Sequence, residues 1–128
     1  MHPTSFESFL KKINLNLSSK TSNLDQEKFL YLTTHGRKSK QPREIEIWFT
    51  HAEGKFYVIA EYTTSNWVLN LQANPTVRVR VADNTVAAQA RVVTAKTDPE
   101  LHKNIQALSI KKYGWGDGLV VELVPEKS

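Results

Sequence analysis

The stretch LTTHGRKSKQPR, residues 32–43, decides the fold and marks one candidate site. It places four cations within seven residues, 37–43, between two apolar runs at residues 29–34 and 45–49. The alternating runs predict two antiparallel strands joined by this turn. Backbone N–H groups, a hydroxyl and guanidinium groups together suit a phosphate anion. The alternative is a solvated hairpin tip, where basic residues are common.

Composition indicates one ordinary globular domain. The chain has 128 residues, of which 40% are hydrophobic, enough to bury roughly two-thirds of its surface on folding. It has no cysteine, which excludes disulfides, thiolate metal sites and cysteine nucleophiles. The net charge of +4 is too mild to indicate a nucleic-acid-binding protein by itself, and an anionic small molecule satisfies it equally well.

The N-terminal segment predicts a short helix followed by a polar loop. Thr4 and Glu7 form a capping box. An amphipathic stripe follows at Phe6, Phe9, Leu10 and Ile13. We therefore divide the single domain into residues 1–27, a helix and connecting loop, and residues 28–128, a β domain. Lys11 and Lys12 interrupt the apolar run and rule out a signal peptide, and no run approaches the roughly 20 residues of a membrane span, so we expect a cytoplasmic protein.

The remaining sequence predicts six strands and two helices. The strands are expected at residues 29–34, 45–49, 56–60, 77–81, 86–93 and 119–124. One helix follows the N-cap residues 63–66 and stops at Asn74-Pro75. The other begins at a capping box, residues 97–100, and ends at Gly114.

This order of elements predicts a mainly β (α+β) fold, a six-stranded antiparallel split β-barrel with short flanking helices. Closure removes exposed sheet edges, which favours a closed or partly closed barrel. Side chains fill the interior of so small a barrel. We therefore expect a ligand to lie outside the barrel, in a groove between two subunits of a homodimer.

Three stretches resemble one known family. Residues 32–43 resemble the "LTT-x-GRKSG-x-PR" stretch of the deazaflavin-dependent nitroreductases. Residues 57–60 resemble that family's strand ending in "VAS", and residues 67–75 resemble its "W-x-x-NL-x-ANP" helix. The family belongs to the split β-barrel flavin-binding superfamily, which includes the pyridoxamine-phosphate oxidases. The resemblance spans residues 29–124.

The resemblance implies a homodimer that binds a flavin-like cofactor, FMN or coenzyme F420, at the subunit interface. The residues implied for its phosphate are Arg37, Lys38, Ser39 and Arg43. Those implied near its ring are Ile59, Ala60 and Glu61, with Trp67 and Asn70 on the flanking helix. Because the ring carries the hydride chemistry, no catalytic nucleophile or acid–base pair is required, and none is assigned.

Two positions depart from the family pattern. Lys40 stands where the family has glycine, which disfavours a positive φ there. Residues 61–66, EYTTSN, replace the family's Gly-Gly and His-Pro, and Glu61 would repel an anionic deazaflavin.

Several aromatic and charged residues have two interpretations. Trp48 and Trp67 stack on a ring or, as large aromatics usually do, belong to the core. Trp115 lies in a loop with three glycines, which fits either a ligand-covering position or a tight turn packing one aromatic. Tyr113 lies at a position where enzymes of the resembled family often have an aromatic residue on the substrate side, so the resemblance implies that place for it. Solvated face residues are expected at Arg78 and Arg80. The histidines lack ligand spacing, so no metal site is expected.

These observations lead to two main hypotheses of different class. The first is an oxidoreductase that transfers a hydride to or from a small organic substrate. The second is a non-catalytic module that holds a flavin, haem or another anionic ligand, motivated by the altered residues 61–66. A nucleic-acid-binding barrel is disfavoured because the cations gather in one turn without an aromatic stacking platform.

Overall fold

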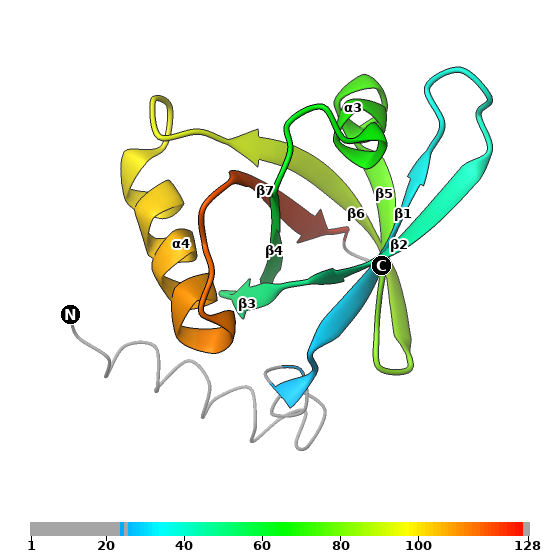
Figure 1. Cartoon of the computed structure of the whole chain (residues 1–128). Coiled ribbons are helices and arrows are strands. Elements are labelled where there is room, and N and C mark those ends of the chain that lie inside the picture. The colour runs from blue at the N-terminus through cyan, green and yellow to red at the C-terminus, as the bar shows by residue number, and fades with distance from the viewer. Residues whose placement is uncertain (1–23, 25, 127–128) are drawn as a thin grey trace.

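Seven strands and two helices make up the described part of the chain, residues 24 and 26–126 of the computed structural model (Figure 1). The strands are β1 (Phe29–His35), β2 (Pro42–Trp48), β3 (Thr50–Ala52), β4 (Lys55–Ala60), β5 (Thr76–Val81), β6 (Asn84–Val93) and β7 (Leu119–Pro125). The helices are α3 (Asn66–Ala73) and α4 (Pro99–Tyr113).

All strands belong to one antiparallel sheet in the order β2-β1-β5-β6-β7-β4-β3. Its two edge strands, β2 and β3, are consecutive in the chain and separated only by Phe49. Because Phe49 links the two edge strands directly, the sheet curls until its two edges lie side by side. β2 also contacts β4. This arrangement is the expected split barrel, built with short helices on its outside.

The number of strands differs from the expected six, because the sequence does not show where the chain changes its pairing partner. β2 pairs with β1, whereas β3 pairs with β4 on the other side of the sheet. Phe49 lies at the corner between them with 1% of its surface exposed. Strands that pass from one sheet layer to another bend at such corners. A short additional strand, β3, is the result.

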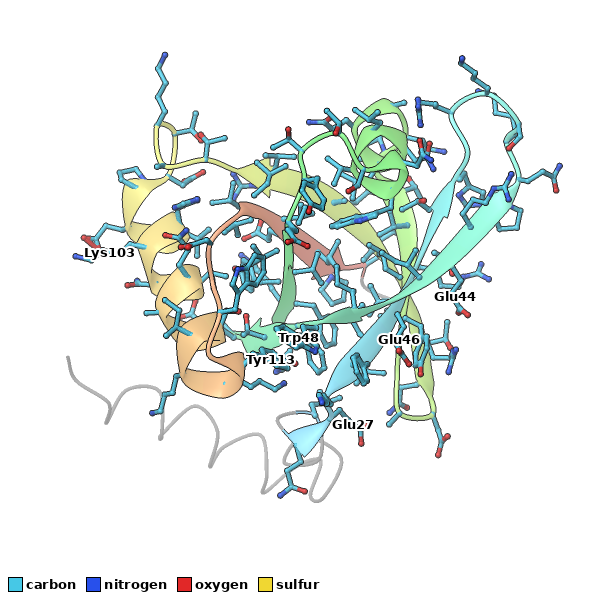
Figure 2. All side chains as sticks on the ribbon, viewed as in Figure 1. Glu27, Glu44, Glu46, Trp48, Lys103 and Tyr113 are labelled. Atoms are coloured by element: carbon cyan, nitrogen blue, oxygen red, sulfur yellow. The ribbon has the colours of Figure 1, made fainter. Side chains whose placement is uncertain are left out.

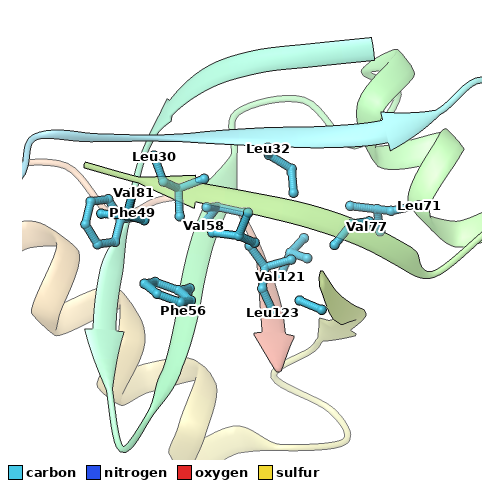
Figure 3. Packing of buried hydrophobic residues seen from close by; sticks show 12 residues of the cluster. Leu30, Leu32, Phe49, Phe56, Val58, Leu71, Val77, Val81, Val121 and Leu123 are labelled. Atoms are coloured by element: carbon cyan, nitrogen blue, oxygen red, sulfur yellow. The ribbon is translucent and has the colours of Figure 1, made fainter. Parts of the chain in front are cut away.

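Strand alternation places the main core inside the curled sheet. Leu30 and Leu32 of β1 are fully buried, and their neighbours on the strand are only half buried. β5 buries its valines in the same alternating way. Figure 3 shows these side chains converging with those of β4 and β7. Each large side chain contributes roughly 1.5–3 kcal/mol on burial, and the filled interior leaves ligand sites to the surface.

Helix α4 covers a second, smaller core formed by residues such as Tyr57 and Ile105. It ends as expected at Gly114, which has a left-handed φ of 82°. Its start corrects the prediction of a capping box at residues 97–100. Asp98 is the N-cap but makes no capping bond, because its carboxylate pairs with Arg91 at 2.8 Å. Thr97 Oγ1 lies instead 2.7 Å from Thr94 Oγ1.

Helix α3 packs on β1 and β6, whereas α4 packs on β3 and β7, so the two helices cover different parts of the sheet (Figure 1). Ser65 is the N-cap of α3, within the predicted cluster 63–66. The helix ends at Asn74, before the proline, as expected. It stands beside the turn between β1 and β2, which brings two of the three stretches of the family resemblance together, residues 32–43 and 67–75.

The predicted N-terminal helix at residues 4–13 lies outside the described residues. Of the loop expected up to residue 27, Leu24 and Gln26 are helical, and Leu24 packs against the main core. Its apolar side chain is therefore held by burial rather than left in a solvated loop. Within the described residues, no helix is long and apolar enough to span a bilayer.

Candidate functional site

Two adjoining hollows lie on the surface of the barrel. The first, here called the basic hollow, has a volume of about 530 Å³ and is lined by Gly36, Arg37, Lys38, Ser39, Arg43, Ile45, Asn66, Trp67 and Asn70. The second, the aromatic hollow, measures about 620 Å³. Trp67 lines both, so the two hollows adjoin at this side chain. Both volumes fall within the range of roughly 300–1,000 Å³ typical of cofactor and drug-sized ligands.

The turn between β1 and β2 is held by its own backbone. Gly36 N–H donates to the Gln41 carbonyl, and Lys40 N–H donates to the Gly36 carbonyl, each at 2.9 Å. Ser39 Oγ accepts the Gln41 N–H at 3.1 Å, and a Cβ at position 36 would collide with this oxygen. Lys40 has a φ of 63°. The lysine thus adopts the left-handed conformation that we expected it to disfavour, because the closed turn requires it.

Asn70 ties this turn to helix α3. Its Oδ1 accepts the Arg37 backbone N–H at 3.1 Å and Arg37 Nη1 at 2.8 Å. Its Nδ2 donates to Thr34 Oγ1 at 3.4 Å. Asn66 Oδ1 accepts from Arg37 Nη2 at 3.4 Å. Asn70 is 4% exposed, so a buried amide fixes the arginine at the wall of the basic hollow.

The cations of the basic hollow keep their charge uncompensated. Among the described residues, no ion pair involves Arg37, Lys38 or Arg43, and no carboxylate lines the hollow. The partners of Arg37 are neutral amides. A hollow with three unpaired cations and a hydroxyl has the donor set that a phosphate needs, and charge-assisted hydrogen bonds are about twice as strong as neutral ones.

The aromatic hollow collects side chains from four strands, two helices and the loops between them. Its lining consists of Phe29, Glu46, Ile47, Trp48, Phe49, Thr50, Tyr57, Ile59, Ala60, Glu61, Tyr62, Ser65, Trp67, Ser109 and Trp115. All three tryptophans of the chain are among them. Trp48 is 37% and Tyr62 64% exposed. Flat aromatic side chains gathered around an open hollow suit a flat aromatic ligand.

The core interpretation is wrong for Trp48, which is 37% exposed. It holds in part for Trp67, which is half buried and packs against the main core while it also lines both hollows. Trp48 alternates onto the outer face of β2 because Phe49 takes the buried corner position. Trp115 lines the aromatic hollow and also packs against the second core cluster, so both interpretations of its loop remain open.

The two charged side chains that line the aromatic hollow, Glu46 and Glu61, are both negative. Glu46 Oε2 accepts the Tyr31 hydroxyl at 2.6 Å, and this hydrogen bond is the main reason why the pKa of Tyr31 is raised. Glu61 is exposed at the end of β4. The two hollows thus differ in sign, positive around the turn and negative around the aromatic side chains.

Tyr113 is not among the residues that line the two hollows, and its place on the substrate side stays a prediction. Its ring stacks on Trp48 with 4.5 Å between centroids, and Figure 2 shows the two side by side. Its hydroxyl lies 2.7 Å from the Lys28 carbonyl and 2.9 Å from the Phe49 carbonyl, and accepts the Phe49 N–H at 3.1 Å. Burial raises its pKa. Tyr113 therefore locks α4 to the β2–β3 corner and supports Trp48 from behind.

A buried carboxylate lies beneath the aromatic hollow. Glu122 is 4% exposed and accepts the Tyr57 hydroxyl at 2.8 Å and Arg91 Nε at 3.1 Å. Lys55 Nζ lies 3.9 Å from it. Burial, together with the hydrogen bond from the Tyr57 hydroxyl to Glu122, strongly raises the pKa of Tyr57. The network holds one aromatic wall of the hollow in place.

The residues predicted to bind the cofactor's phosphate lie in one hollow, and those predicted to lie near its ring line the other. Arg37, Lys38, Ser39 and Arg43 meet in the basic hollow with Trp67 and Asn70, while Ile59, Ala60 and Glu61 line the aromatic hollow. The outer-face arginines stay apart from both: Arg80 lies over Tyr31 at 4.1 Å and pairs with Glu44 at 3.3 Å. The sequence missed Asn66, Tyr62 and Ser109. The polar run 61–66 was a usable signal for the first two, but a serine within a helix gives none.

Comparison with known proteins places the chain in a family. Solved structures with the same fold include an F420-H2 dependent reductase, FDR-A, with a TM-score of 0.63 and 22% identity over 75% of this chain and 93% of that one. The heme storage protein HutZ of Vibrio cholerae gives a TM-score of 0.66 at 19% identity, covering 96% of this chain and 92% of that one.

A pyridoxamine 5'-phosphate oxidase-like protein of Listeria innocua gives a TM-score of 0.67 at 18% identity, covering 93% of this chain and 94% of that one. At these low identities, the structural similarity shows the fold alone. A family model described as F420H(2)-dependent quinone reductase matches residues 10–117, which confirms the resemblance carried by the basic turn and helix α3. The chain thus belongs to the F420H(2)-dependent quinone reductase family and is an oxidoreductase.

Proposed function

We propose that this protein transfers a hydride from reduced coenzyme F420 to a quinone-type acceptor. The observation that carries the proposal is the pair of hollows joined at Trp67, one with unpaired cations and the other lined by aromatic rings. A cofactor with a phosphate and a flat tricyclic ring matches both hollows. The sequence left FMN and F420 open, and the family favours F420.

The residues of the basic hollow would hold the phosphate. Arg37 and Arg43 supply forked donors, Lys38 a point charge and Ser39 a hydroxyl. Asn70 holds Arg37 in place through two hydrogen bonds. Since the turn is already closed by its own backbone bonds, little ordering is needed on binding, which favours affinity.

The residues of the aromatic hollow would hold the ring and the acceptor against each other and exclude water. When bound, the deazaflavin ring supplies two electrons and a proton as hydride, and a second proton from solvent completes the hydroquinone. The chain's own contribution is positioning: Ile59 and Ala60 form a flat wall at the end of β4, and Trp67 separates the ring end from the phosphate end. Glu61 stands at the open rim.

We also infer a homodimer whose second subunit covers the rim of the aromatic hollow. Trp48 and Tyr62, two of the three exposed large hydrophobic residues of the described chain, lie on this rim. Exposed aromatics beside a ligand hollow favour burial by a partner. Sedimentation of a monomer at micromolar concentration would contradict the inference.

The test is a pair of fluorescence titrations of the purified, cofactor-free protein with F420 and with FMN, followed by turnover of reduced F420 with menadione, a neutral quinone. We expect micromolar or tighter binding of F420, weaker binding of FMN, and quinone-dependent oxidation. Binding of F420 without turnover by any quinone would support the non-catalytic binding module instead. Binding of neither cofactor would reject the proposal.

A further inference from the structure

The loop at residues 114–118, with sequence GWGDG, is fastened to its surroundings rather than free. At its start, Gly114 N–H donates to the Ile110 carbonyl at 2.8 Å. One residue further, the Trp115 carbonyl accepts the Ser109 hydroxyl at 2.6 Å. Ser109 is 5% exposed. This hydrogen bond is therefore shielded from water and fixes the backbone of Trp115 against α4.

Two glycines bring the loop into backbone contact with its neighbours. A Cβ on Gly116 would lie 2.5 Å from the Gln106 carbonyl oxygen of α4. Gly118 has a φ of 153°, and a Cβ there would collide with the Ala60 carbonyl oxygen of β4. The loop is thus attached to α4 at one end and to β4 at the other, and Trp115 is held between these attachments.

Trp115 belongs to the part of the aromatic hollow that is not shared with the basic hollow. It lines the aromatic hollow together with Ser109, Ile59 and Ala60, but it is absent from the basic hollow, which Trp67 borders. Its indole packs on the second core cluster under α4. A cofactor whose phosphate lies in the basic hollow passes Trp67 first, which leaves the Trp115 end to the acceptor.

We propose that Trp115 is the wall that limits the size of the acceptor, and that Ser109 is the positioning residue that holds this wall. The inference rests on the proposed function and deepens it. A wall with fixed backbone does not yield to a larger ligand, because closely packed protein interiors are not deformable at little cost. The hollow therefore selects flat, apolar acceptors of small ring number and excludes those with additional fused rings.

The test compares menadione, with two fused rings, and 9,10-phenanthrenequinone, with three. Tryptophan-fluorescence quenching gives the affinity of each quinone without turnover, and steady-state kinetics gives KM and kcat. In Trp115→Ala we expect a roughly tenfold weaker affinity for menadione, the scale of losing part of an apolar pocket, and a preference shifted toward phenanthrenequinone. KM for reduced F420 should stay within about twofold. Ser109→Ala should shift the preference in the same direction by a smaller factor.

Lys103→Ala, on the outward face of the same helix (Figure 2), is the matched control and should leave the preference unchanged. An unchanged ratio of the two quinone affinities in Trp115→Ala would overturn the inference even if F420 binds normally. A Ser109→Ala variant with lowered Tm and the original preference would overturn the positioning role alone. If the unsubstituted protein fails to bind F420, the proposed function fails, while the quenching ratios still decide whether Trp115 sets the size of the hollow.

Discussion

The basic hollow and the aromatic hollow adjoin at one tryptophan but are built in opposite ways. The basic hollow comes from one turn, residues 36–43, and one face of α3. The aromatic hollow draws on strands, a helix and loops that range from Phe29 to Trp115 in the chain. The first is positive and polar, and the second is apolar with two carboxylates. We therefore expect the basic hollow to set the affinity for an anion and the aromatic hollow to select among flat molecules.

This separation teaches that the two functions can be perturbed independently. Changes in the turn should alter cofactor affinity and spare the fold, because the cations are exposed and unpaired. Changes beneath the aromatic hollow should alter stability first, because its walls are held by buried hydrogen bonds such as that between Tyr57 and Glu122. Asn70 belongs to both groups, since it is buried and also holds Arg37.

The largest effect is expected from the double substitution Arg37→Ala/Arg43→Ala. Each hydrogen bond to a charged group contributes about 1.5–3 kcal/mol, so the Kd for F420 should rise at least about 100-fold. The midpoint of thermal unfolding should change little. Isothermal titration calorimetry and a thermal melt measure the two quantities.

Arg78→Ala is the control for this experiment, because Arg78 is an exposed arginine that lines neither hollow. It should bind F420 as the unsubstituted protein does. Equal affinity for F420 in the double variant and in the control would contradict the placement of the cofactor's phosphate in the basic hollow.

An intermediate effect on both properties is expected from Asn70→Ala. The change leaves the part-buried Arg37 backbone N–H without its acceptor, frees Arg37 Nη1, and removes the donor to the buried Thr34 hydroxyl. A buried polar group left unpaired costs about 1–3 kcal/mol, so the unfolding free energy should fall by about this amount, with roughly tenfold weaker F420 binding. Urea denaturation and titration test this.

Asn74→Ala is the matched control for Asn70, since Asn74 follows the same helix, is exposed, and its Oδ1 accepts the Thr76 N–H at 3.2 Å. It should lower stability by less and leave binding unchanged. Loss of stability without loss of affinity in Asn70→Ala would show that Arg37 needs no support to bind its ligand.

The smallest effect concerns pH and the Tyr57→Phe substitution. The raised pKa of Tyr57 means that the unfolded chain loses this proton first, near the ordinary tyrosine pKa of about 10. Stability contributed by Tyr57 is therefore complete below that pH and declines as the pH rises above it. Between about pH 9 and 11, the unfolding free energy of Tyr57→Phe should fall less steeply than that of the unsubstituted protein.

Tyr62→Phe, which alters a 64% exposed tyrosine of the same hollow, should follow the unsubstituted protein in this measurement. Equal slopes for Tyr57→Phe and the unsubstituted protein would mean that the bond to Glu122 does not survive in solution.

Most of the fold could be predicted because its signals are local. The alternation of Leu30 and Leu32 with half-buried neighbours, and the glycine at the end of α4, depend on neighbouring residues alone. The failures came where a distant partner decided. Asp98 makes no capping bond because its carboxylate binds Arg91 instead. β3 forms because residues 50–52 pair with β4 rather than with β1.

The sequence by itself determined the strands of the split barrel and the basic turn, because alternating burial and a compact run of cations depend on adjacent residues. The family resemblance implied that α3 flanks the turn, and the tertiary structure supplied the contact itself. Only the tertiary structure decided which aromatic side chains share a hollow, that Tyr113 supports rather than lines it, and that Ser109 holds Trp115. The physical reason is range. Strand and turn preferences act over a few residues, whereas the curl of the sheet brings Phe29, Trp67 and Trp115 together only after the whole chain has folded.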